Sequence, residues 1–115
     1  MGNESVNIAK LLREVVTPAL EQVVAEINTN EASEGYSARL GNQGPKLDHR
    51  RPIRDARSVT VYFNGRIITT FSIFWPDSNI LMAGDLSTIG FETLDLENLT
   101  MKVVKEKAKA ELGVK

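Results

Sequence analysis

The stretch VTVYFNGRIITTF, residues 59–71, predicts a β-hairpin and decides the fold. Asn64-Gly65 separates two runs rich in β-branched and aromatic residues, and both turn residues tolerate the positive φ that a two-residue hairpin turn needs. Such a turn fixes the register of the two strands. The cross-strand pairs that it predicts are Phe63 with Arg66, Tyr62 with Ile67, Val61 with Ile68 and Thr60 with Thr69.

This register predicts large apolar side chains on both faces of the hairpin. One face would carry Val59, Val61, Phe63, Ile68 and Phe74. The opposite face would carry Tyr62, Ile67, Phe71, Ile73 and Trp75. Two helices cover one face of a small sheet, so we expect the second set to form an interface with another chain. Tyr and Trp are residue types that dominate the energetics of such interfaces.

Further strands are expected on both sides of the hairpin. Pro76 ends the second hairpin strand, and residues 77–79, Asp-Ser-Asn, form a turn. Residues 80–83 would make a third strand, and residues 36–40 a fourth at an edge of the sheet. The pattern therefore indicates an antiparallel β-meander of three or four strands.

A helix is predicted from about Ser5 to about Asn28, because apolar residues recur there at steps of three and four. The stripe consists of Ile8, Leu11, Leu12, Val15, Ala19, Val23 and Ile27, widened by Val16, Leu20 and Val24. Pro18 lies inside it, where its ring collides with the Glu14 carbonyl. The stripe keeps its phase through Pro18, which favours one kinked helix over a second helix capped by Thr17.

A closing helix is predicted after residue 93. Asp95 or Thr93 would cap it, acidic residues would occupy its first turn, and Gly113 would end it. Its buried stripe would be Leu96, Leu99, Val103 and Ala110. The fold class expected for residues 1–115 is therefore a single α+β domain, with a kinked N-terminal helix, an antiparallel meander and a C-terminal helix.

The composition is that of an ordinary globular domain. The 115 residues include 42% apolar and 25% charged residues, no Cys, and a net charge of −1. Without Cys the chain has neither a disulfide nor a thiolate site, so a cytoplasmic location is expected. No apolar run has the length of a signal peptide or a bilayer span, and no membrane association is expected.

Positive charge concentrates in the middle of the chain, where residues 41–57 read GNQGPKLDHRRPIRDAR. This segment lacks strand or helix periodicity, and a structureless loop of such length tends to be functional or disordered. Four arginines that could bind phosphate or carboxylate oxygens fall within eight positions: Arg50, Arg51, Arg54 and Arg57. The alternative is a solvated loop whose arginines pair with Asp48 and Asp55.

Catalysis finds little support in the sequence. His49 is the one histidine, and one His without Cys cannot build a closed zinc site. Nucleophile-elbow, phosphate-loop and dinucleotide motifs are absent. Asp77 and Asp85 flank a short strand as turn residues rather than an acid–base pair.

The sequence therefore predicts a small interaction protein that is not an enzyme and needs no metal or cofactor. It would bind another protein or a second copy of itself, as a homodimer, through the face that bears Tyr62 and Trp75. The alternative is a nucleic-acid or phosphate-binding module that uses the Arg-rich loop 46–57.

Overall fold

A computed structural model describes residues 7–30, 34–43, 46–48, 51–76, 80–84 and 91–113. The helical elements are α1 (Ile8–Leu11), the π-helical η1 (Leu12–Val16), α2 (Thr17–Asn30), the 3₁₀ turn η3 (Leu96–Asn98) and α3 (Met101–Leu112). The strands are β1 (Tyr36–Gln43), β2 (Lys46–Asp48), β3 (Arg51–Ile53), β4 (Asp55–Phe63), β5 (Arg66–Trp75), β6 (Met82–Gly84) and β7 (Phe91–Thr93).

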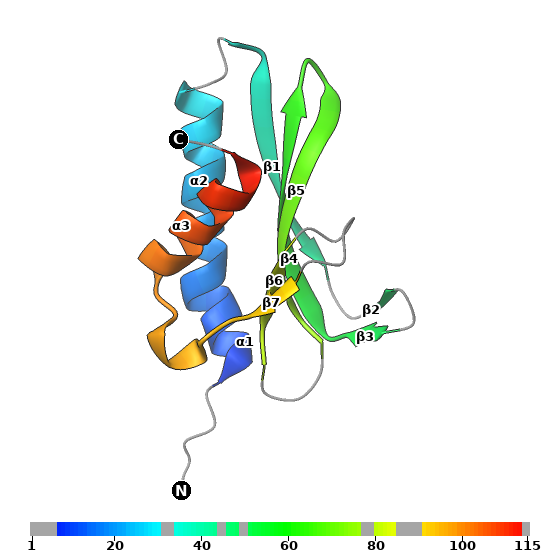
Figure 1. The fold of residues 1–115 in the computed structure, drawn as a ribbon, viewed down its shortest axis with the longest axis vertical. Coiled ribbons are helices and arrows are strands. Elements are labelled where there is room, and N and C mark those ends of the chain that lie inside the picture. Colours follow the sequence, from blue (N-terminus) through cyan, green and yellow to red (C-terminus); the bar gives the residue numbers. More distant parts are fainter. Residues whose placement is uncertain are drawn as a thin grey trace, which may run out of the picture.

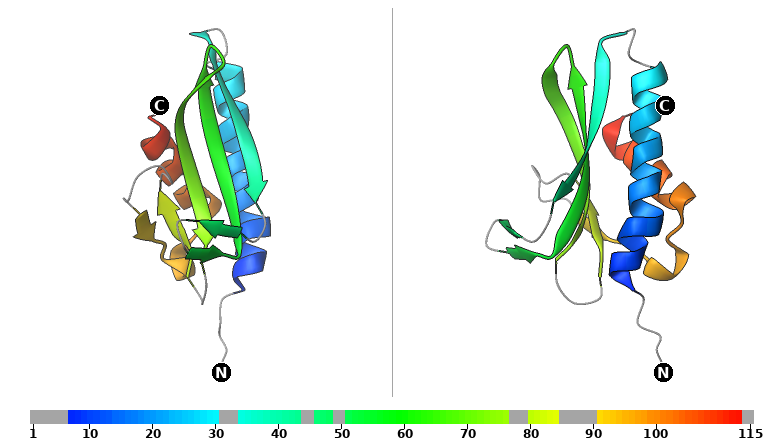
Figure 2. Two further views of the ribbon diagram at one scale, coloured as in Figure 1. Left: turned by 90° about the vertical axis from the view of Figure 1, so that its right-hand side faces the viewer. Right: turned by 180° about the vertical axis from the view of Figure 1, so that it is seen from behind.

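The main sheet has five antiparallel strands in the order β1-β4-β5-β6-β7, and β2 and β3 pair separately as a short hairpin. Both long helices lie on one face of the main sheet (Figures 1 and 2), called here the helix-covered face; the opposite face is the outer face. The α+β meander predicted from the sequence is confirmed. The sheet gains a fifth strand, β7, which three residues were too few to reveal.

The N-terminal helix passes Pro18 without breaking. Leu12–Val16 widen into a π-turn, and the Thr17 N–H bonds the Leu12 carbonyl five residues back. This wider turn precedes Pro18 and relieves the conflict between a proline ring and the carbonyl four residues before it. Thr17 keeps helical dihedrals and donates its hydroxyl to the Leu12 carbonyl at 2.6 Å, so it does not cap a second helix.

The Asn64-Gly65 turn forms as expected, with φ of 50° and 83° at the two residues. Phe63 pairs with Arg66 and Tyr62 with Ile67, as predicted. The register then shifts, because Ile68 is an extra residue in β5 and Val61 pairs with Thr69. The predicted pairing of Val61 with Ile68 is therefore wrong, and every later residue of β5 faces the side opposite to the prediction.

The main core lies between the helices and the sheet. From α1, η1 and α2 it takes seven apolar side chains that are at most 2% exposed: Ile8, Leu12, Val16, Ala19, Leu20, Val23 and Ile27. The sheet contributes Val59, Val61, Phe71 and Ile73. Phe71 and Ile73 belong to this layer because the bulge turns them towards the helices, where burial of each contributes roughly 1.5–3 kcal/mol.

The segment 41–57 is mostly strand rather than loop. β1 continues to Gln43, β2 and β3 pair in antiparallel fashion, and β4 begins at Asp55. The prediction of a structureless loop is therefore wrong. β2 and β3 have three residues each, too few to show a strand period, and β1 and β4 enter the segment with three residues each.

The closing helix differs from the prediction in start and phase. Asp95 caps only η3, and the Thr100 hydroxyl caps α3 by accepting from the Val103 N–H at 3.2 Å. Val104, Ala108 and Leu112 are buried in α3, whereas Ala110 is exposed. The interruption at Leu99-Thr100 resets the helical phase. Gly113 ends the helix with a φ of 72°, as predicted.

Candidate functional site

The five residues predicted to form one binding face do not share a face. Phe71 and Ile73 are 1% and 0% exposed within the core, and half-buried Trp75 packs against the same core. Tyr62 and Ile67 pair with each other at the other end of the hairpin. The physical reason is the Ile68 bulge, which exchanges the two faces of β5 between Ile67 and Thr69.

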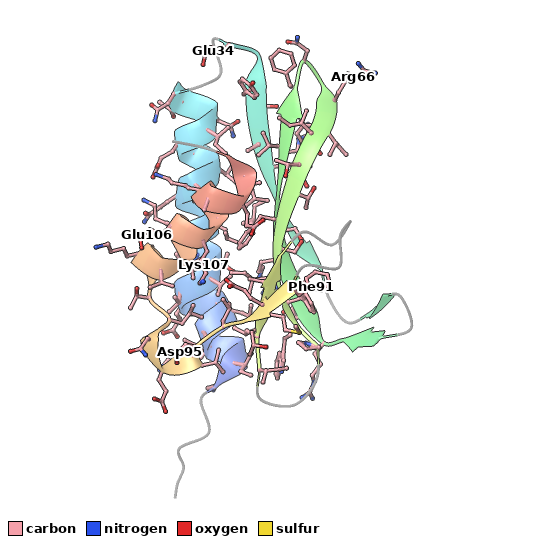
Figure 3. The ribbon with its side chains drawn as sticks, viewed as in Figure 1. Glu34, Arg66, Phe91, Asp95, Glu106 and Lys107 are labelled. Atoms are coloured by element: carbon pink, nitrogen blue, oxygen red, sulfur yellow. The ribbon has the colours of Figure 1, made fainter. Side chains whose placement is uncertain are left out.

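The end of the β4–β5 hairpin, residues 63–68, carries exposed apolar side chains. Ile67 is 66% and Ile68 52% exposed, the highest values of any large apolar residue that the structure describes. Phe63 is partly exposed, and its ring lies 4.9 Å from that of Tyr36. Figure 3 shows Arg66 at this end, pointing away from the helix layer. We call residues 63–68 the hairpin end.

One lateral edge of the sheet is open beside the hairpin end. β6 pairs with β5 only at Ser72, Ile73 and Phe74, so Arg66–Phe71 pair with β4 alone among the described strands. Phe63 and Arg66 close the turn, and ladder positions alternate from there. The N–H and C=O groups of Ile67 and, past the bulge, of Thr70 therefore point away from β4. We call Arg66–Phe71 the open edge.

The other lateral edge, β1, is bridged by a side chain. The Asn28 amide of α2 donates to the Ala38 carbonyl at 3.0 Å and accepts from the Ala38 N–H at 2.8 Å. Asn28 thus occupies both outward backbone groups of Ala38, as a neighbouring strand would. We call β1 the bridged edge. No local pattern marks Asn28 for this role, because its partner lies ten residues away in a strand.

Of the four arginines predicted to bind an anion, the structure describes the side chains of Arg54 and Arg57. The Arg57 side chain is 16% exposed and bonds the Asp55 carboxylate at 2.7 Å and the Thr17 hydroxyl at 3.0 Å. It joins β4 to Thr17, the first residue of α2. Arg50 and His49 lie outside the described residues. The side chain of Arg51, in β3, also lies outside them.

Arg54 lies beside the sheet, with its guanidinium 4.7 Å from the centre of the Trp75 ring. Arg39 of β1 lies 5.8 Å from the centre of the Tyr62 ring on the outer face. Both distances fit cation–π contacts. By register, the outer face of β1, β4, β5, β6 and β7 holds no Asp or Glu among the described residues.

The lower outer face is closed by its own packing. Phe74 and Ala56 are buried there, and the Phe91 ring meets the Phe74 ring edge-on at 5.1 Å. Ser58 and Ser72 pair through a 2.7 Å hydroxyl contact and are also buried. Because these rings contact each other and these hydroxyls bond each other, this part of the outer face is a poor binding site for a ligand.

The hollows on the helix side are shallow. One of them, about 400 Å³, lies between α2 and α3 and is lined by Gln22, Met101, Lys102, Lys105, Glu106 and Lys109. Lys105 and Lys109 both donate to the Glu26 carboxylate. These two hydrogen bonds, with the larger effect from Lys105, lower the pKa of Glu26 below its ordinary value, whereas burial raises it by a smaller amount. Within the described ranges, no three His, Cys, Asp or Glu side chains come close enough to hold a metal ion.

The sequence matches no protein-family model, and no curated protein or solved structure is significantly similar to it. No helix in the described part of the chain is long and apolar enough to cross a bilayer.

Proposed function

We propose that this chain is a non-enzymatic interaction module that binds a protein partner at the open edge and the hairpin end. One observation carries the proposal: at the open edge, outward backbone groups have no ladder partner among the described strands, and they lie beside Ile67 and Ile68, the most exposed large apolar residues described. Proteins normally shield such an edge with charge, cover or pairing, because it invites another strand.

The side chains around the open edge suit an extended polypeptide. A partner strand that adds to a sheet edge gains main-chain hydrogen bonds, and alternate side chains supply its specificity. Ile67 lies on the outer face with Tyr62 across the ladder, and Thr70 follows on the same face with Thr60. The Ile68 bulge limits the pairing to a short segment, which favours a reversible contact over open-ended aggregation.

Differential capture tests this function. Immobilised wild-type chain is compared, in native lysate, with Ile67→Lys/Ile68→Lys and with Ile80→Lys. Ile80 is also a partly exposed isoleucine but lies outside the hairpin end, so it is the matched control. The proteins retained by the wild type should be lost from the double variant and kept by Ile80→Lys. Retention by the double variant, with its fold intact by circular dichroism, would contradict the proposal.

A second candidate function is binding of single-stranded nucleic acid across the outer face. The observation that favours it is the Arg39–Tyr62 contact on a face without described carboxylates. Arg and aromatic side chains on a sheet surface can hold phosphates and stack bases. Fluorescence polarisation at low salt tests it: Arg39→Ala should weaken binding of a labelled oligonucleotide. A wild type that binds neither RNA nor DNA at low salt removes this candidate.

A further inference from the structure

From the open edge we infer that the partner is a second copy of this chain, docked β5 to β5 in antiparallel fashion about a two-fold axis. The inference rests on the proposed function and deepens it, since it names the occupant of the same edge. The two copies would form one continuous sheet with the central order β1-β4-β5-β5-β4-β1.

The length of the open edge argues for a second copy. The turn at Asn64-Gly65 bounds it at one end, and the first β6 pair, Ser72 with Gly84, bounds it at the other. Six residues, 66–71, therefore have no described strand beside them other than β4 in each copy. When two such segments run antiparallel about their common midpoint, between Ile68 and Thr69, residues 66–71 of one copy lie opposite residues 71–66 of the other. The described β6 pairs, at Ser72, Ile73 and Phe74, lie outside this overlap.

The outward backbone groups fit the same symmetry. Ile67 and Thr70 lie at equal distances from the midpoint, so each Ile67 would exchange two hydrogen bonds with Thr70 of the partner. In a regular strand, residues three apart point their backbone groups in opposite directions, and this pairing would fail. The Ile68 bulge restores the match, because its extra residue brings Ile67 and Thr70 into the same outward orientation.

Side chains and charges agree with this pairing. Ile67 and Thr70 share the outer face, so they would become cross-strand neighbours. Ile68 of the two copies would meet close to the axis and lose its exposure. Arg66, the one charged residue of the open edge, would lie opposite Phe71 of the partner, and the two Arg66 residues would stand roughly 15 Å apart. The bridged edge cannot pair in this way, because Asn28 occupies Ala38.

A contact this short belongs to the small, transient class of interfaces, so we expect a dissociation constant of about 10–100 μM. Light scattering over a concentration series should therefore show the mass rise from 12.7 kDa towards twice that value. Thr70→Pro should keep the mass at 12.7 kDa, because proline removes the outward N–H without removing a bond to β4. Ile67→Lys should also keep the mass at 12.7 kDa, and it replaces the proline variant if that variant does not fold.

Cysteine cross-linking fixes the register, since the chain contains no Cys of its own. Chains with Ile67→Cys and chains with Thr70→Cys, differently tagged, are mixed under mild oxidation. Opposite residues of a hydrogen-bonded antiparallel pair have Cα atoms about 5.5 Å apart, within the range of a disulfide. The mixed cross-link should form in preference to one between the matched control chains Ser37→Cys and Arg39→Cys on the bridged edge.

A wild type that stays at 12.7 kDa at millimolar concentration, without the Ile67–Thr70 cross-link, would overturn the inference. A dimer that persists in both Thr70→Pro and Ile67→Lys would overturn it as well. Neither outcome touches the proposed function, which depends on whether Ile67→Lys/Ile68→Lys loses its captured proteins. Loss of those proteins from a monomeric chain would instead point to a different protein strand at the same edge.

Discussion

Both lateral edges of the main sheet have backbone N–H and C=O groups that point away from the sheet, and the two edges differ in what these groups contact. β1 has the outward N–H and C=O of Ala38 bonded to the Asn28 side chain of α2. β5 leaves Arg66–Phe71 without a described neighbour beyond β4, and exposed Ile67 and Ile68 lie there. One edge thus has a side-chain partner at Ala38, whereas the other has no partner among the described residues at Ile67 and Thr70.

Within β5, the exposed residues of the open edge are followed after a few positions by residues of the core. Substitutions on the two sides of this boundary should differ most in their effect on the free energy of unfolding. Phe71→Ala should lower the free energy of unfolding by about 3–5 kcal/mol, because Phe71 is fully buried between sheet and helices. Ile67→Ala, four residues earlier, should change it by less than about 0.5 kcal/mol at low protein concentration. Urea denaturation measures both. Equal losses would mean that the boundary is misplaced.

The bridged edge should weaken when its bridge is removed. Asn28→Ala leaves two backbone groups of Ala38 without their partner, so we expect a loss of about 1–2 kcal/mol in the free energy of unfolding. Asn28→Asp, which keeps the acceptor for the Ala38 N–H but loses the donor, should fall between the wild type and the alanine variant. If Asn28→Ala leaves stability unchanged, the side chain does not complete this edge.

In the helix layer, Glu26 of α2 forms ion pairs with Lys105 and Lys109 of α3. Its substitution has the smallest expected effect on the free energy of unfolding. Lys105 and Lys109 lower the pKa of Glu26 in the folded chain from the ordinary value of 4.5. A lowered pKa contributes stability that is present above the unfolded value and is lost as the pH falls through the folded value. Glu26→Gln should therefore cost less than about 1 kcal/mol at pH 7, since the pair is partly exposed.

The difference between Glu26→Gln and the wild type should shrink as the pH falls below about 4.5. Thermal unfolding from pH 7 to pH 3 measures it. Glu111→Gln is the control, because that residue is exposed and its carboxylate forms no ion pair with a described residue. A constant difference across this range would show that the ion pairs with Lys105 and Lys109 do not stabilise the fold.

The sequence was sufficient for features that depend on neighbouring residues. Asn64-Gly65 predicted the turn and its first two pairs, and the spacing of Ile8, Leu12, Val23 and Ile27 predicted the buried side of the first helix. Gly113 marked the end of the last helix. Each of these signals lies within one turn or one helix, so no distant contact had to be known.

The features that define the candidate site depend on distant contacts instead. Nothing in the run RIITTF shows that Ile68 is an extra residue, because a bulge is chosen by the packing of Val61, Phe71 and Ile73 against the helices. The predicted face therefore mixed core residues with exposed ones. For Arg57 the structure shows the pairing with Asp55 that the sequence offers as an alternative, whereas its second partner, Thr17, lies forty residues away and has no local signal.

Amide hydrogen exchange measured residue by residue in dilute solution tests the difference between the two edges most directly. The Ala38 N–H should be protected, because it donates to the side-chain oxygen Oδ1 of Asn28, with the two heavy atoms 2.8 Å apart. The N–H groups of Ile67 and Thr70 should exchange freely in the monomer and become protected as the chain concentration rises. Protection of Ile67 and Thr70 at all concentrations, or rapid exchange at Ala38, would contradict a sheet with one bridged and one open edge.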